Sequence, residues 1–171
     1  NIIRYNFILP KNLKVICGGE SVPSLLINQL TQNINLDNIL VVYGPTETTI
    51  WSSAYSTSDS ILNLPNLPIG HPIINTSLYI LDNNLNFVPV GVVGDIYIGG
   101  VGLARGYLNK ADLTSEKFIA NPFASIEDVR EGKNLRLYRS GDLGRYLPDG
   151  NIEFIGRIDD QVKIRGYRIE L

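Results

Sequence analysis

Charged side chains suited to ligand binding are concentrated near the end of the chain, between Tyr138 and Leu171. Short apolar runs and glycines separate them, and acidic and basic groups alternate closely: Asp142, Arg157, Asp159, Asp160, Lys163, Arg165 and Arg168. A buried core does not need so many charges, and a solvated face does not carry so many apolar residues. The segment therefore predicts either a binding site built on strands or a salt-bridged β-meander.

A hairpin is predicted inside this segment. The runs 143–147 and 151–155 flank Pro148-Asp149-Gly150, in which proline presets φ and glycine adopts a positive φ. The chain then passes through Gly156 into a charged joint and a basic strand expected over Val162 to Ile169. A ribbon end, a charged joint and a basic strand thus lie close together in the sequence.

A second motif, VVYGPTETTIW, spans Val41 to Trp51 and changes the balance between these alternatives. A β-branched run ends at Tyr43, and a loop rich in oxygen-bearing side chains follows Gly44-Pro45. Ligands of open α/β sheets bind at this end of a strand. A tyrosine offers a flat face to a purine, a threonine bonds a phosphate oxygen, and a lone carboxylate suits Mg²⁺. The alternative is an exposed polar loop. The run 99–106, GGVGLARG, matches neither common glycine-rich nucleotide fingerprint.

The composition excludes several classes of protein. The 171 residues include 44% hydrophobic and 19% charged residues with a net charge of −2, so bulk electrostatics favour neither nucleic acid nor a membrane. Cys17 is the single cysteine and His71 the single histidine, which argues against a disulfide, a metal cluster or a Ser-His triad. With no membrane-spanning run and no signal peptide, a cytoplasmic location is expected.

Two regions are predicted from the pattern of strands and helices. The first is a β-α-β unit with strands at 13–17 and 39–42 and a helix at 23–30 that Ser21 caps. The second is an antiparallel sheet or small distorted barrel, with a helix at 110–118 and a surface loop at 121–133. Its expected strands lie at 76–81, 92–98, 135–138, 143–147 and 151–155.

Five motifs in this order resemble core motifs of the adenylation domains of nonribosomal peptide synthetases, which belong to the adenylate-forming, AMP-binding enzyme superfamily. They are LKVICGGES, YGPTETT, GDIYIGGVGLARGYL, YRSGDL and GRIDDQVKIRGYRIEL. The resemblance implies an internal fragment of α/β (α+β) class. Residues 1–60 would end the α/β subdomain of the large lobe, 61–158 form a barrel-like subdomain, and 159–171 hold the hinge and the start of the C-terminal lobe. The family's phosphate loop and catalytic lysine would lie outside this chain.

The resemblance also implies residue roles. Asp142 would accept the ribose hydroxyls, Glu47 would bind Mg²⁺, and Asp159 would be the hinge. The implied ATP and AMP contacts are Gly19, Glu20, Ser21, Tyr43, Gly44, Thr46, Asp142, Phe154 and Arg157. No catalytic residue is assigned within the fragment, which alone is expected to be inactive.

The implied reaction joins an amino acid to AMP and then loads it on the phosphopantetheine thiol of a carrier domain, beside a condensation domain. Five positions would line the amino-acid pocket: Ile16, Gly18, Val42, Ile50 and Trp51. None is charged and Trp51 is large, so a small amino acid is predicted. The Ile50-Trp51 pair resembles glycine-activating pockets of the family, which puts glycine first and cysteine or alanine next. If Trp51 turns outward, the pocket is larger. The alternatives are an acyl-CoA or aryl-acid ligase of the same superfamily, or a fragment with a non-catalytic nucleotide-binding or structural role.

Overall fold

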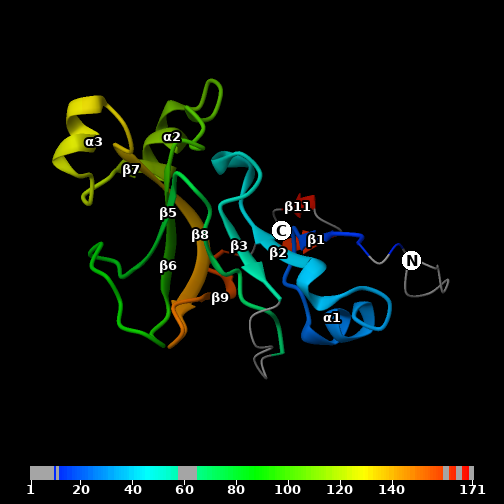
Figure 1. Cartoon of the computed structure of the whole chain (residues 1–171). Coiled ribbons are helices and arrows are strands. Elements are labelled where there is room, and N and C mark those ends of the chain that lie inside the picture. The colour runs from blue at the N-terminus through cyan, green and yellow to red at the C-terminus, as the bar shows by residue number, and fades with distance from the viewer. Residues whose placement is uncertain (1–9, 11, 58–64, 160–161, 165–166, 170–171) are drawn as a thin grey trace.

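The computed structural model describes residue 10 and residues 12–57, 65–159, 162–164 and 167–169. Its two larger sheets lie side by side, with α1 on the outer side of one and α2 and α3 at one end of the other (Figure 1). The expected boundary between residues 60 and 61, and Asp160 and Arg165 of the charged segment, lie outside the described residues.

The first sheet has the order β1-β2-β3-β4, with β1 parallel to β2 and the other pairs antiparallel. Its strands are β1 (Val15–Gly18), β2 (Ile39–Tyr43), β3 (Ser53–Ser56) and β4 (His71–Pro72). The helix α1 (Ser24–Leu30) connects β1 to β2 and buries Ile27 and Leu30, which lie one turn apart on one face. The short helix η1 (Leu36–Asn38) then leads into β2. The predicted parallel β-α-β unit is confirmed.

The predicted cap of α1 is wrong. Pro23 occupies the N-cap position with an extended backbone and makes no side-chain cap hydrogen bond. Ser21 is exposed and lies two residues too early to reach the free N–H groups of the helix. A proline just before the first turn is compatible with the helix because its φ is already fixed at −65°.

The second sheet is antiparallel, as predicted. Its order is β5-β6-β8-β7, with β9 also pairing with β8, and the pairings among the described strands form an open path. The bounds are β5 (Thr76–Leu81), β6 (Gly94–Gly100), β7 (Phe118–Ala120), β8 (Arg136–Tyr146) and β9 (Ile152–Arg157). Leu147 N–H bonds Asn151 O at 2.8 Å across the predicted Pro148–Gly150 turn.

Three local predictions differ from the structure. The expected strands 135–138 and 143–147 are one strand, β8, because Gly141 continues it with a φ of +75°. The expected loop 121–133 contains α3 (Ile126–Glu131), which begins with a Ser125–Asp128 capping box. The expected single strand 162–169 is an antiparallel pair, β10 (Val162–Ile164) and β11 (Tyr167–Ile169). The helix α2 (Ala111–Lys117) is confirmed.

The two larger sheets share a hydrophobic core. Tyr43, the last residue of β2, packs in one cluster with buried isoleucines and a leucine of the second region: Ile69, Leu78, Ile80, Ile96, Ile98 and Ile152. A separate cluster under α1 includes Ile27, Ile39 and Tyr55. The shared cluster fixes the end of β2 against the second sheet. The VVYGPTETTIW motif therefore faces strands β8 and β9, which belong to the charged segment near the end of the chain. Within the described part of the chain, no helix is long and apolar enough to cross a membrane.

Candidate functional site

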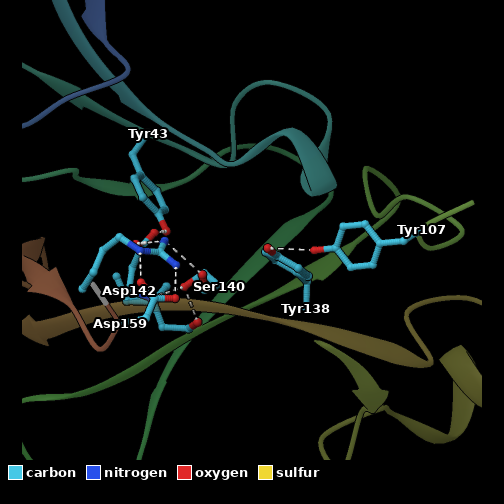
Figure 2. Close-up of polar contacts among 8 residues, drawn as sticks. Tyr43, Tyr107, Tyr138, Ser140, Asp142 and Asp159 are labelled. Carbon is cyan, nitrogen blue, oxygen red and sulfur yellow. Dashed lines mark hydrogen bonds and ion pairs between the residues drawn. The ribbon is translucent and has the colours of Figure 1, made fainter. Parts of the chain in front are cut away.

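Tyr43 and Asp142 meet although they are separated by 99 positions in the sequence (Figure 2). The Tyr43 hydroxyl donates a hydrogen bond to Asp142 Oδ2 at 2.5 Å. Asp142 is only 2% exposed and lies in the middle of β8, where its backbone N–H bonds Ser140 Oγ at 3.0 Å. The two residues therefore converge, but through the tyrosine hydroxyl rather than a ring face, and the carboxylate is covered.

Arg157 covers the other side of this carboxylate. Its Nη1 donates to Asp142 Oδ1 at 2.7 Å, while Nε and Nη2 form a bidentate pair with Asp159 at 2.7 and 2.8 Å. The β8–β9 pairing places Arg157 opposite Asp142. The expected ribose ligand, phosphate cation and hinge residue are thus joined in one network, which we call the Asp142 network: Tyr43, Ser140, Asp142, Arg157 and Asp159.

The protonation states within the Asp142 network follow from burial and pairing. Burial, reinforced by the Asp142 charge, raises the pKa of Tyr43 well above its ordinary value, so Tyr43 is a neutral donor. The hydrogen bonds from Arg157 to Asp159, with the Asp142 charge, raise the pKa of the guanidinium further. Arg157 therefore remains a cation between two acidic side chains.

Glu47 lies in the short helix η2 (Thr46–Thr48), next to the end of β2. Its side chain is 9% exposed, and its Oε1 accepts a hydrogen bond from the Tyr107 hydroxyl at 2.6 Å. Burial and the bond to Glu47 raise the pKa of Tyr107, which keeps its hydroxyl protonated. The Tyr107 hydroxyl also lies 3.5 Å from that of Tyr138 in β8, apart from the Tyr43–Asp142 contact (Figure 2).

The donor chemistry of this loop fits Mg²⁺ as a cofactor of a phosphate substrate. Among the described residues, no three His, Cys, Asp or Glu side chains form a metal cage. Mg²⁺ commonly uses one or two carboxylates together with substrate phosphates and water, rather than an all-protein shell. Glu47 supplies the carboxylate, and Thr46 beside it carries a hydroxyl.

All five residues of the predicted amino-acid pocket line one cavity of about 710 Å³: Ile16, Gly18, Val42, Ile50 and Trp51, together with Gly19, Gly44, Thr46 and Thr49. Among the residues that the structure describes, no charged side chain lines it. Gly18 is required there because a Cβ would lie 2.5 Å from Val42 O. Thr49 and Ile50 have positive φ values of 61° and 72°, which turn the chain so that Ile50 and Trp51 border the cavity. Ile50 remains 68% exposed and Trp51 43% exposed, so the cavity is open.

Other candidate residues are placed less directly. Phe154 has its ring centroid 6.3 Å from that of Tyr43 and packs against the shared core. Gly19 borders the cavity, whereas Glu20 and Ser21 are exposed and do not line it. The sequence predictions missed Tyr107, because its segment lacks a nucleotide fingerprint and its hydroxyl meets Glu47 only through the fold. They also missed a second cavity beside it, of about 780 Å³, bordered by Arg105, Phe118 and Arg136 among others.

The strand ends of a parallel β-α-β unit, an apolar cavity and an adjacent polar network define an α/β ligand-binding protein. A family model described as AMP-binding enzyme matches residues 5–108, and the chain belongs to this family. It is 48% identical over 161 residues to a dimodular nonribosomal peptide synthase of Bacillus subtilis (strain 168), covering 94% of this chain and 6% of that protein. It is 45% identical over 163 residues to bacitracin synthase 1 of Bacillus licheniformis, covering 95% of this chain and 3% of that protein.

Solved structures agree with this assignment. A nonribosomal peptide synthetase protein with adenylation and PCP domains, bound to a vinylsulfonamide inhibitor, superposes with a TM-score of 0.81 at 32% identity, over 92% of this chain and 26% of that one. A four-domain nonribosomal peptide synthetase bound to AMP and glycine gives a TM-score of 0.77 at 38% identity, over 99% of this chain and 12% of that one. The predicted family and fold class are confirmed. The chain spans 6% or less of the length of the two curated relatives named above.

Proposed function

We propose that the protein carrying this chain activates an amino acid as its aminoacyl adenylate and transfers it to a phosphopantetheine thiol on a carrier domain. The observation that carries this proposal is the placement of two adjacent residues of β2. Val42 borders the apolar cavity, and Tyr43, on the opposite face, binds Asp142. An amino-acid side chain and a nucleotide would therefore be held on two sides of one strand end.

The reaction needs no covalent participation by the protein. A carboxylate oxygen of the amino acid attacks the α-phosphorus of ATP, the bond from that phosphorus to the oxygen bridging the β-phosphate breaks, and pyrophosphate leaves with the electron pair. The carrier thiolate then attacks the acyl carbon and AMP departs. The chain's own residues bind and orient the reactants, which is the main contribution proteins make to such transfers.

Asp142 and Arg157 are proposed to bind the ribose and the phosphates. Because Arg157 now covers Asp142 Oδ1, ribose binding at this carboxylate requires Arg157 to move toward the phosphates. Asp159 is proposed as the hinge, since it closely follows β9 and binds the same arginine. Mg²⁺ held by Glu47 would offset phosphate charge when it is bound, and Thr46 would hydrogen-bond a phosphate oxygen. Gly19, Gly44 and Phe154 are proposed contacts of the adenosine.

The proposed substrate is a small amino acid, glycine first. The described residues that line the cavity of about 710 Å³ carry no charge, which disfavours a charged substrate side chain because it would be desolvated without a partner. A 38% identical neighbour has AMP and glycine bound. The relatives named above are peptide synthetases, which does not favour an acyl-CoA or aryl-acid ligase. The proposed partners are carrier and condensation domains of a synthetase.

The test is amino-acid-dependent exchange of pyrophosphate into ATP by the complete protein, across all the common amino acids. We expect the strongest exchange with glycine, followed by alanine or cysteine, and thioester formation on the carrier detected as a mass increase. Trp51→Ala should shift the preference toward larger apolar amino acids. Strongest exchange by the unmodified protein with phenylalanine or lysine rejects the small-substrate proposal. No exchange with any amino acid rejects the proposed function.

A further inference from the structure

The loop that carries Glu47 is attached to a segment of the second region, residues 102–107, at three points. Ala104 N–H donates to Glu47 O at 2.8 Å, and Thr49 Oγ1 donates to Gly102 O at 2.7 Å. The third contact joins the Tyr107 hydroxyl to Glu47 Oε1 at 2.6 Å. The first contact holds the backbone of the loop, the second holds the Thr49 side chain, and the third holds the carboxylate itself.

Tyr107 is itself held in place by three neighbours. Its backbone N–H bonds Thr114 Oγ1 in α2 at 2.9 Å, its ring meets Phe118 edge-on at 5.9 Å between centroids, and its hydroxyl lies 3.5 Å from that of Tyr138. Tyr138 is fully buried in β8. The Tyr107 hydroxyl is therefore a donor whose position is set by α2, β7 and β8, rather than by the loop that it contacts.

We propose that Tyr107 is a positioning residue that orients the Glu47 carboxylate for Mg²⁺·ATP. This inference rests on the proposed function, because it needs Glu47 to be the metal ligand. A glutamate side chain has three rotatable bonds and loses affinity as a ligand if it must be ordered when the metal binds. A hydrogen bond from a fixed donor supplies that order in advance, as outer-shell partners of metal-binding carboxylates do.

Gly102 shows how closely the two segments approach. A Cβ at this position would lie 2.9 Å from Thr48 O, so any larger residue must displace the loop backbone. The segment 102–107 thus acts as a template for the loop, through contact at Gly102 and through hydrogen bonds at Ala104 and Tyr107. The three hydrogen bonds that attach the loop to this template involve no residue of the Asp142 network.

The test compares Tyr107→Phe with Tyr146→Phe in the complete protein. The first removes the hydroxyl that binds Glu47 and keeps the ring against Phe118. The matched control removes a hydroxyl that donates to Leu78 O at 3.3 Å, in another part of the sheet. The readout is the ratio of the ATP dissociation constant in EDTA to that in excess Mg²⁺, measured by calorimetry. The Mg²⁺ midpoint of pyrophosphate exchange provides a second readout.

We expect Tyr107→Phe to lower this ratio about 10-fold, the smaller of the usual effects of losing an outer-shell partner. The ATP dissociation constant in EDTA should stay unchanged, and Tyr146→Phe should match the unmodified protein. Gly102→Ala should lower the ratio in the same direction by displacing Thr48 O. An unchanged ratio in Tyr107→Phe overturns the inference, and so does an equal weakening of ATP binding with and without Mg²⁺, which indicates a structural role.

These outcomes separate the inference from the proposed function. An unmodified protein that binds ATP more tightly with Mg²⁺ but shows no amino-acid-dependent exchange rejects the proposed function, while the Tyr107 comparison still decides the inference. An unmodified protein whose ATP affinity does not respond to Mg²⁺ overturns the metal role of Glu47 and the inference together.

Discussion

Replacing Asp142 by asparagine is expected to loosen the β8–β9 pair far more than the same change at Asp159, although both carboxylates bind Arg157. The difference lies in burial. The Asp142 side chain is 2% exposed and that of Asp159 is 35% exposed, with Arg157 at 11% between them. The Tyr43 hydroxyl and Arg157 Nη1 each donate to one oxygen of Asp142. In Asp142→Asn, an amide NH2 group replaces one of these oxygens, so one donor would face another donor.

The magnitude follows from the two environments. Breaking a buried ion pair on one side typically costs about 3–5 kcal/mol, and because Asp159 still neutralises Arg157 we expect the lower end, about 3 kcal/mol for Asp142→Asn. Since each 1.4 kcal/mol is a factor of ten, the local opening equilibrium should rise roughly 150-fold. The partly exposed Asp159 contributes about 1 kcal/mol or less, which corresponds to about fivefold or less.

Hydrogen–deuterium exchange of β8 and β9 peptides in the complete protein measures these changes, and ATP affinity is measured in parallel. Asp95→Asn is the matched control, because Asp95 is 5% exposed, pairs with Arg139 and lies in the same sheet outside the Asp142 network. Asp95→Asn should loosen β6 and β8 and leave ATP affinity intact. Asp142→Asn should both loosen the β8–β9 pair and weaken ATP binding. Equal exchange in the Asp142 and Asp159 variants would refute the argument from burial.

Three further predictions concern other parts of the fold. Gly70→Ala places a Cβ 2.0 Å from Ala54 O at a φ of +78° and should lower the melting temperature well below that of Gly91→Ala, which shares a positive φ of +82° but has open space around it. Hydrogen bonds from Ser125 hold the pKa of Asp128 below its ordinary 3.8, so the stabilisation by the α3 cap is present above that pH and should be lost as pH falls through the lower pKa of the folded state. Protection factors in α3, which correct exchange for its intrinsic pH dependence, should fall in acid, and unchanged factors would contradict this. Asp159→Pro should affect adenylation and thioester formation unequally by fixing φ, while Asp159→Ala should spare this balance; equal loss of both half-reactions in the proline variant argues against a hinge.

Local patterns in the sequence were sufficient for much of the fold. The strand at 76–81 and the Pro148–Gly150 turn appear as predicted, because alternation and turn chemistry are properties of neighbouring residues. The helix α3 was missed although Ser125 and Asp128 have capping-box spacing. At six residues, α3 is too short to show the repeated apolar spacing that identifies longer helices.

The pocket and the Asp142 network differ in how far the sequence predicts them. Three pocket positions, Ile16, Gly18 and Val42, lie on the paired strands β1 and β2, so a parallel β-α-β unit is enough to bring them together. Ile50 and Trp51 border the cavity because of the positive φ values in the loop that follows. The contacts of Asp142 depend instead on the register of β8 with β9, which shifts beside Leu143 and Gly144. No local sequence pattern predicts such a shift in register. The contact in which Arg157 covers Asp142 could therefore not be predicted from the sequence.

The register of β8 is also what joins the two halves of the candidate site. Tyr138 lies beside Tyr107 near Glu47, while Ser140 and Asp142, further along the strand, bind Ile96 O and Tyr43. A slip of one residue would reverse the faces of all these side chains, and Gly141 or Leu143 would replace Asp142 beside Tyr43. Two irregularities in pairing hold β8 against such a slip: one with β6, between Asp95 and Tyr97, and one with β9, between Leu143 and Gly144. Gly141, which made YRSGDL resemble a break between strands, therefore permits the backbone turn that places Asp142 beside Tyr43.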